Sequence, residues 1–97
     1  MGQLYRIRTM EDELRVRILT CEAEILLFLK DNEGRKIRDL CEVSKYSHVT
    51  IHEYIRKLTA AGVIAKDVFD GDGRRVRYRL TEKADKVLDD LYGELEN

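Results

Sequence analysis

The chain has 97 residues, of which 43% are hydrophobic and 38% charged, and its formal net charge is −1. This length corresponds to one domain, and the apolar content is high enough for a core, which excludes general disorder. No apolar run approaches the roughly 20 residues of a membrane span. Residues 1–6 lack the apolar stretch of a secretory signal, so we expect a cytoplasmic protein without membrane contact.

The N-terminal segment, residues 1–9, is expected to be an irregular or extended arm, with Thr9 capping a helix that begins near Met10. From Leu14 to Phe28 apolar residues recur at intervals of four and three, the period of a two-faced helix. A break is expected just before residue 20, where Thr20 caps a fresh helical segment.

Gly34 favours the end of this helix, and a short second helix is expected over residues 35–43. The third helix begins after Ser47, a preferred N-cap residue. Its buried stripe has the i, i+4, i+7 spacing of one helix face and consists of Ile51, Ile55 and Leu58. The sequence 61–63, Ala-Gly-Val, then stops the helix.

Two alternating segments, residues 63–69 and 75–80, predict a β-hairpin around the Asp/Gly-rich turn at 70–73. In the second segment Val76, Tyr78 and Leu80 face one way, and Arg75, Arg77 and Arg79 face the other. Thr81 is expected to cap a last helix that has an apolar side over residues 84–95. The predicted fold class is therefore mainly α with a small β-hairpin, in the order α-α-α-β-β-α.

This order of elements resembles the winged helix-turn-helix fold of MarR-like and ArsR-like transcription regulators. Their strand-to-helix signature is Asp-x-Arg, five residues, Leu-Thr and an acidic–basic pair, and it is present over residues 72–83. A third-helix pattern of Ser, Thr, an apolar residue and Leu-x-x-x-Gly is present over residues 47–62. The resemblance covers roughly residues 19–88 and implies a single winged-helix DNA-binding domain over residues 1–97.

Two features depart from the family pattern. MarR-like proteins are usually longer, with extended terminal dimerisation helices, and Ala84 stands where the family often has glycine. These departures concern effector sensing more than DNA binding. A chain this short also leaves little room for a ligand pocket of a few hundred Å³, so we expect no small-molecule effector.

The charge of the chain is unevenly distributed. Residues 35–79 hold eleven Lys/Arg against six Asp/Glu, whereas the remainder holds seven against thirteen. We therefore expect one continuous cationic surface, made by the exposed side of the third helix and the hairpin, that binds double-stranded DNA. A helix fits the major groove and a hairpin touches the backbone or minor groove.

The predicted DNA-contacting residues are His48, Val49, His52 and Arg56 on the third helix, Arg74, Arg75, Arg77 and Arg79 on the hairpin, and Lys36, Arg38 and Lys45 around the second helix. The resemblance implies that Arg74 enters the minor groove. Glu53 lies on the same helix and would repel phosphate unless it accepts from a cytosine amine or pairs with a basic neighbour.

A homodimer is expected, because both terminal helices are more apolar on one side than a three-helix domain requires. Residues 1–18 and 82–97 would supply the interface, and the candidate side chains are Leu14, Ile18, Leu88, Leu91 and Leu95. A two-fold pair presents its recognition helices roughly 34–36 Å apart to a palindromic site. The alternative for these stripes is packing within the chain's own core.

The same residues allow other interpretations. An adaptor that binds protein through a winged helix is the main alternative, and the near-zero net charge favours it. His48 and His52 have a metal-ligand spacing but lack further ligands, and the turn at 70–73 resembles a calcium loop without its final glutamate. No metal, cofactor or catalytic activity is therefore expected.

The two cysteines, Cys21 and Cys41, do not form the disulfide framework of a secreted domain and fit a reducing compartment. Cys41 is expected to pack in the core. Packing is also favoured for Cys21, although partial exposure would allow a redox sensor or an intersubunit disulfide. The high charged fraction and the presence of only three side-chain amides are typical of a thermophilic source.

Overall fold

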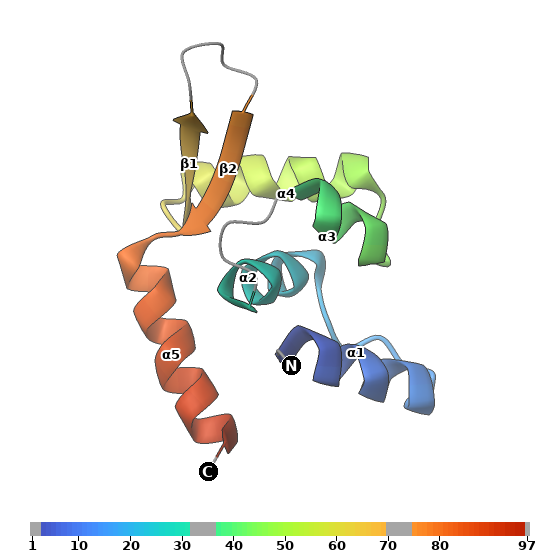
Figure 1. The fold of residues 1–97 in the computed structure, drawn as a ribbon. Coiled ribbons are helices and arrows are strands. Elements are labelled where there is room, and N and C mark those ends of the chain that lie inside the picture. The colour runs from blue at the N-terminus through green and yellow to red at the C-terminus, as the bar shows by residue number, and fades with distance from the viewer. Residues whose placement is uncertain (1–2, 32–36, 70–74, 97) are drawn as a thin grey trace.

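A computed structural model describes residues 3–31, 37–69 and 75–96 of the chain. Its elements in order are α1 (Gln3–Leu14), α2 (Cys21–Asp31), α3 (Ile37–Val43), α4 (His48–Ala60), β1 (Ile64–Phe69), β2 (Arg75–Leu80) and α5 (Glu82–Glu96). The expected mainly helical fold with one hairpin is confirmed. The chain has one more helix than the expected order α-α-α-β-β-α, and this additional helix is α1. In Figure 1, α2 lies at the centre, with α4 and the hairpin on one side of it and α1 on the other.

The expectation of an irregular N-terminal arm is wrong, because residues 3–14 form α1. Its inward positions are taken by Leu4 and Ile7, which are apolar, and by Arg8 and Glu11, which are charged. The two charged members hide the amphipathic period from a sequence reading. Thr9 does not cap a helix, and its hydroxyl donates to the carbonyl oxygen of Tyr5 one turn earlier, at 3.0 Å.

Helix α1 ends with a left-handed residue. Arg15 has a φ of 56°, and the amide of the next residue, Val16, donates to the carbonyl oxygen of Glu11 at 3.1 Å. Glycine is favoured in this conformation, which costs other residues roughly 1–2 kcal/mol. The predicted break before α2 is confirmed, since the Thr20 hydroxyl accepts from the amide of Ala23 at 3.1 Å.

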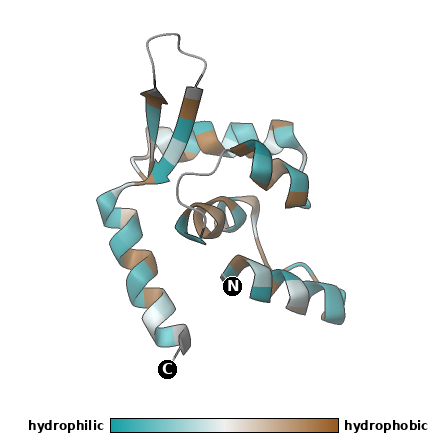
Figure 2. Cartoon of the chain, in the orientation of Figure 1, coloured by the Kyte–Doolittle hydropathy of each residue, from teal (hydrophilic) through white to brown (hydrophobic). Residues whose placement is uncertain are grey.

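The core is built around α2. Figure 2 shows hydrophobic residues, in brown, along this helix, and side chains from α1, α3, α4 and β1 pack in the same core cluster. The predicted inner stripe of α4 is confirmed as buried: Ile51, Ile55 and Leu58. The run of apolar residues that begins at Leu14 does not continue as one helix face, because the break leaves Leu14 and Ile18 exposed.

Cys21 is buried at the start of α2, with 4% of its surface exposed, so the favoured expectation of packing is confirmed and the alternative of partial exposure is wrong. Burial and the neighbouring carboxylates of Glu24 and Glu22 raise the pKa of its thiol to about 11. A thiol of this kind is a poor source of thiolate, so the redox-sensor hypothesis loses its basis. Cys41 is half-buried against the core, as its predicted packing requires.

The hairpin has a regular antiparallel register that runs from Ile64 opposite Leu80 to Phe69 opposite Arg75. Along β2 the described side chains alternate between half-buried and exposed, which confirms the predicted two-faced strand. Gly62, with a φ of 76°, ends α4 and lets the chain turn into β1. The turn at 70–73 lies outside the described residues.

Helix α5 is joined to the rest of the molecule at its start and along its length. Thr81 directly precedes it, as predicted, but its hydroxyl donates to the carbonyl oxygens of Gly62 and Val63, at 3.0 and 3.1 Å. Lys30 of α2 forms ion pairs with Asp85, at 2.8 Å, and with Asp89. The β1–β2 hairpin, which we call the wing, and helix α5 are therefore fixed to the end of α4 and to α2.

Asp31, the last residue of α2, joins both terminal helices. Its two carboxylate oxygens accept from the Tyr92 hydroxyl of α5, at 2.8 Å, and from the amide of Leu4 in α1, at 3.2 Å. Burial and Asp31 raise the pKa of the Tyr92 hydroxyl above its ordinary value. Within the described residues, no helix has the length and apolar character needed to cross a membrane.

Candidate nucleic-acid interface

The predicted recognition helix is α4, and its start is capped as the sequence indicates. The Ser47 side chain accepts from the amide of Thr50 at 3.2 Å. Since the stripe of α4 that faces α2 is buried, the helix presents its opposite side to solvent. All four candidate residues of this helix are exposed there: His48, Val49, His52 and Arg56.

Aromatic and basic side chains are interleaved along α4. The rings of His48 and His52 meet edge to face with 6.4 Å between their centroids. The ammonium of Lys57 lies 5.0 Å from the centroid of the Tyr54 ring, a cation–π contact. In the part of the chain that the structure describes, no three His, Cys, Asp or Glu side chains come together as a potential metal site.

The wing presents Arg77 and Arg79 on the exposed side of β2. Arg79 is paired within the hairpin, because its Nε lies 2.9 Å from Oδ2 of Asp67. Both side chains are open to solvent, with 53% and 37% of their surface exposed, so the pair contributes at most about 1 kcal/mol. Figure 1 shows the hairpin rising beside the C-terminal end of α4.

The remaining cationic candidates divide into three groups. Arg38 is exposed on α3. Lys36 and Arg74 lie outside the described residues, as does the side chain of Arg75. Lys45, in the turn between α3 and α4, has its ammonium 3.0 Å from Asp12 and 3.6 Å from Glu11, so its charge is already compensated.

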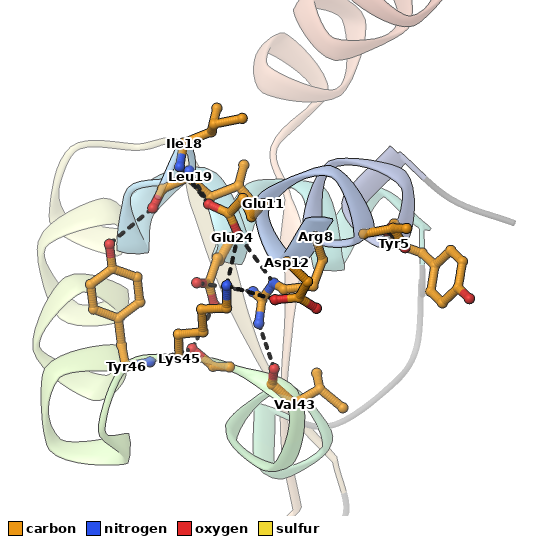
Figure 3. Close-up of polar contacts among 12 residues, drawn as sticks. Tyr5, Arg8, Glu11, Asp12, Ile18, Leu19, Glu24, Val43, Lys45 and Tyr46 are labelled. Carbon is orange, nitrogen blue, oxygen red and sulfur yellow. Dashed lines mark hydrogen bonds and ion pairs between the residues drawn. The ribbon is translucent and has the colours of Figure 1, made fainter. Parts of the chain in front are cut away.

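Beneath this turn lies a group of charged and polar side chains that the sequence did not connect with one another, and we call it the support cluster: Arg8, Glu11, Glu24, Ser44 and Lys45. Figure 3 shows it between α1, the start of α2 and the turn that leads into α4. Arg8 donates to the carbonyl oxygen of Val43 at 2.7 Å and lies 3.0 Å from Glu24. The N-terminal helix is thereby joined to the end of α3.

Glu24 extends the support cluster to the turn. Its second oxygen accepts from the Ser44 hydroxyl at 2.5 Å, and the same hydroxyl oxygen accepts from the amide of Tyr46 at 3.0 Å. The Tyr46 hydroxyl in turn donates to the carbonyl oxygen of Leu19 at 2.9 Å. The residues that immediately precede α4 are therefore held by α2 and its leading segment.

Glu11 is as enclosed as Glu24, with 1% of its surface exposed. One carboxylate oxygen accepts from the amides of Ile18, at 2.6 Å, and Leu19, at 2.8 Å. Burial alone would raise the pKa of this carboxyl, but these hydrogen bonds and the charges of Lys45 and Arg8 outweigh it, and the pKa is lowered. Glu11 therefore stays ionised and fixes the segment between α1 and α2. The signal in the sequence is the placement of Arg8 and Glu11 in phase with Leu4.

The candidate dimerisation residues are placed unequally. Leu14, Ile18 and Leu91 are exposed, with Leu91 on α5 and the other two at and after the end of α1. Leu88 is 9% exposed and already covered within its own chain. The side chain of Leu95 lies outside the described part of the molecule.

The capped, outward-facing helix α4 and the adjoining hairpin define a small winged-helix domain. The chain belongs to the winged helix DNA-binding domain family, whose sequence model matches residues 20–84. The expected kinship with winged-helix transcription regulators is thereby confirmed. Whether the chain is MarR-like in particular stays a prediction. Proteins of this family are typically not enzymes.

Among solved structures, the chain is similar to a mutant of Lactococcus lactis ZitR, with a TM-score of 0.64 and 26% sequence identity. The likeness covers 84% of this chain and 55% of that chain, so the present sequence spans about half the length of its structural relative. A comparison with curated proteins finds no match. Helix α1 precedes the family match, so the support cluster joins the family domain to a segment outside it.

Proposed function

We propose that the chain is a sequence-specific DNA-binding regulator that acts as a homodimer, with α4 in the major groove and the wing on the backbone or minor groove. The observation that carries this proposal is the exposed side of α4. That side holds two histidines, a valine and an arginine, while the opposite side is buried against α2. This is the arrangement that recognition helices of this class use.

Each exposed side chain of α4 has a chemical counterpart on DNA. His48, His52 and Arg56 donate hydrogen bonds to base edges or phosphates, and Val49 offers an apolar contact to a thymine methyl group. Glu53, also exposed, is suited to accept from a cytosine amine. These contacts would set sequence preference.

The wing would supply affinity that does not depend on sequence. Arg77 and Arg79 are exposed, and an exposed pair such as Arg79–Asp67 can be replaced by an arginine–phosphate contact. Arginine binds phosphate in a planar, two-pronged geometry, which suits a wing that follows the backbone. Arg38 would add a contact from α3, whereas Lys45 would first have to leave Asp12.

The dimer would be formed by residues 1–18 and 82–97. Leu14, Ile18 and Leu91 are the exposed apolar side chains that support it, and the burial of Leu88 leaves that residue a smaller part. A two-fold axis between such protomers would set two copies of α4 roughly 34–36 Å apart, one turn of DNA.

The test is a titration of a labelled 30-base-pair random duplex at several salt concentrations. Loss of one phosphate contact lowers the slope of log affinity against log salt by about 0.9, so Arg77→Ala should show a decrease of that size. Arg6→Ala, which removes an exposed arginine of α1, is the matched control and should leave the slope unchanged. Equal slopes for the two variants would remove the wing from the interface.

Sequence reading by α4 is tested separately, by selection of bound duplexes from a random pool. His52→Ala should relax the preference at one base position, by about 1–3 kcal/mol, and leave the salt slope nearly unchanged. The same selection reports the spacing of half-sites and hence the dimer. An unaltered consensus would place His52 outside the base-reading set.

A second candidate function is a winged helix that binds another protein and not DNA. The pairing of Lys45 and Arg79 with carboxylates favours it, because both cations are partly neutralised before any DNA arrives. The two functions differ in the titration above. The adaptor shows no binding to random duplex at low salt, whereas the regulator binds.

A further inference from the structure

We propose that Arg15 and Arg17, in the segment between α1 and α2, form a second phosphate-binding site beside the start of α4. The DNA footprint would then extend past the recognition helix, on the side opposite the wing. This inference rests on the proposed DNA-binding function and deepens it, and it concerns residues that precede the family match at residue 20.

Arg17 is placed near the start of α4 by a cation–π contact. Its guanidinium carbon lies 5.3 Å from the centroid of the Tyr46 ring. Tyr46 is held by its hydroxyl bond to Leu19 and directly precedes Ser47, the N-cap of α4. A guanidinium in a cation–π contact still has N–H groups available for hydrogen bonds. The contact therefore presents Arg17 as a ready donor next to the recognition helix.

Arg15 and Arg17 also carry charge that the described part of the chain leaves uncompensated. Both are exposed, and no described carboxylate forms an ion pair with either of them. The two acidic groups nearby are engaged elsewhere, since Glu11 accepts from backbone amides and Asp12 pairs with Lys45. Among the described cations around the start of α4, Arg15 and Arg17 therefore remain without a described carboxylate partner, whereas Lys45 is paired.

The conformation of Arg15 is a third observation. Its φ of 56° is one that glycine adopts most easily, yet the side chain there is long, charged and exposed, so it contributes nothing to the core. An open pocket of about 380 Å³ lies next to it, lined by Glu11, Asp12, Arg15, Val16, Arg17 and Lys45. A non-glycine residue in a left-handed conformation that gains no packing from its side chain points to a binding role for that side chain.

The position fits the backbone of a duplex. Recognition helices of this class contact base edges with their N-terminal residues, so groups beside that end meet the wall of the major groove, which is phosphate backbone. Arg15 and Arg17 would bind there, and the wing would bind at the other end of α4. The duplex would be held at both ends of the helix.

The experiment compares the full chain with Arg15→Ala/Arg17→Ala and with the control Arg6→Ala, on the random 30-base-pair duplex. Two lost phosphate contacts should lower the salt slope by about 1.8 and the affinity at 0.1 M salt by roughly 60-fold. Arg6→Ala removes an exposed arginine from α1, the helix that precedes this segment, and should match the wild type. A double variant with the wild-type slope overturns the inference.

The wing variant separates this inference from the function on which it rests. If the wild type fails to bind duplex, the proposed function fails. If Arg77→Ala lowers the slope while Arg15→Ala/Arg17→Ala does not, only the second phosphate site fails. If the double variant instead keeps its slope and weakens self-association in sedimentation experiments, the two arginines bind a second protomer and the inference is overturned.

Arg15→Gly distinguishes binding from a structural role. Glycine relieves the left-handed conformation, so the thermal midpoint should rise by roughly 4 °C. The same change removes a cation, so the salt slope should fall by about 0.9. A more stable protein that binds DNA less tightly cannot be explained by damage to the fold. An unchanged slope in this variant would count against the site.

Discussion

The support cluster and the exposed face of the wing use the same residue types and differ in burial. In the support cluster, Arg8 is 16% exposed and contacts Glu24, which is nearly fully enclosed, while on the wing Arg79 and Asp67 are both open to solvent. The first pair has little access to water and cannot be exchanged. The second is surrounded by water and counter-ions. An ion pair therefore fixes geometry in one region and leaves a cation available in the other.

The difference has an energetic consequence. Removing one partner of a buried pair leaves a charge in a poorly solvated place, which costs about 3–5 kcal/mol. Removing one partner of an exposed pair costs about 1 kcal/mol or less, because water replaces it. Arginine substitutions in this protein should therefore separate into those that unfold the chain and those that weaken its binding.

Arg8→Ala should have the largest effect among the substitutions that destabilise the fold. It would leave the carboxylates of Glu24 and Glu11 without their shared cation and the Val43 carbonyl oxygen without its donor. We expect the free energy of unfolding to fall by about 3–5 kcal/mol, measured by urea denaturation. Arg6→Ala, on the exposed side of the same helix, should change it by no more than about 0.5 kcal/mol. If both variants lost a similar amount of unfolding free energy, the proposed difference between buried and exposed arginines would be wrong.

Glu11→Gln tests the same cluster through its dependence on pH. The pKa of Glu11 is lower in the folded chain than its ordinary value, so the ionised carboxylate stabilises the fold above that ordinary value. This stability is lost as the pH falls through the folded-state pKa. The wild type should therefore lose stability steeply in acid, and Glu11→Gln should lose less over the same range.

At neutral pH, Glu11→Gln should already be less stable by about 1–3 kcal/mol, because a neutral amide bonds the two backbone amides less well. Acid denaturation followed by circular dichroism measures both effects. Asp90→Asn, which alters an exposed carboxylate on α5, is the control. If wild type and Glu11→Gln lost stability over the same range of low pH and by the same amount, another carboxyl group would be responsible for the acid denaturation.

The sequence predicted correctly those features that depend on residues within a single helix or strand. The cap at Ser47, the buried stripe of α4 and the alternation along β2 depend on neighbours a few residues away, and all three are confirmed. It failed for α1, because Arg8 and Glu11 look like solvent-facing residues until their partners in α2 and α3 are known. Contacts between distant segments decide such cases.

The same limit applies to the candidate site. Exposure of the α4 residues follows from helix period, so their placement could be predicted. The placement of Lys45 could not, because it faces Asp12, 33 positions earlier in the chain. Leu88 was a candidate for the interface or for packing within the chain, and its 9% exposure depends on contacts between α5 and distant segments, which the sequence does not reveal.

Asp67→Asn should have the smallest effect on stability, and it tests directly whether the exposed pair leaves Arg79 available for DNA. It removes the carboxylate that holds Arg79, so the unfolding free energy should change by less than about 1 kcal/mol. Affinity for random duplex at 0.1 M salt should rise, by up to about eightfold, since the wing gains one uncompensated positive charge. Asp90→Asn on α5 should leave affinity unchanged. If Asp67→Asn lowered affinity, Asp67 would be orienting Arg79 toward the backbone, and an exposed ion pair would be fixing geometry as the buried ones do.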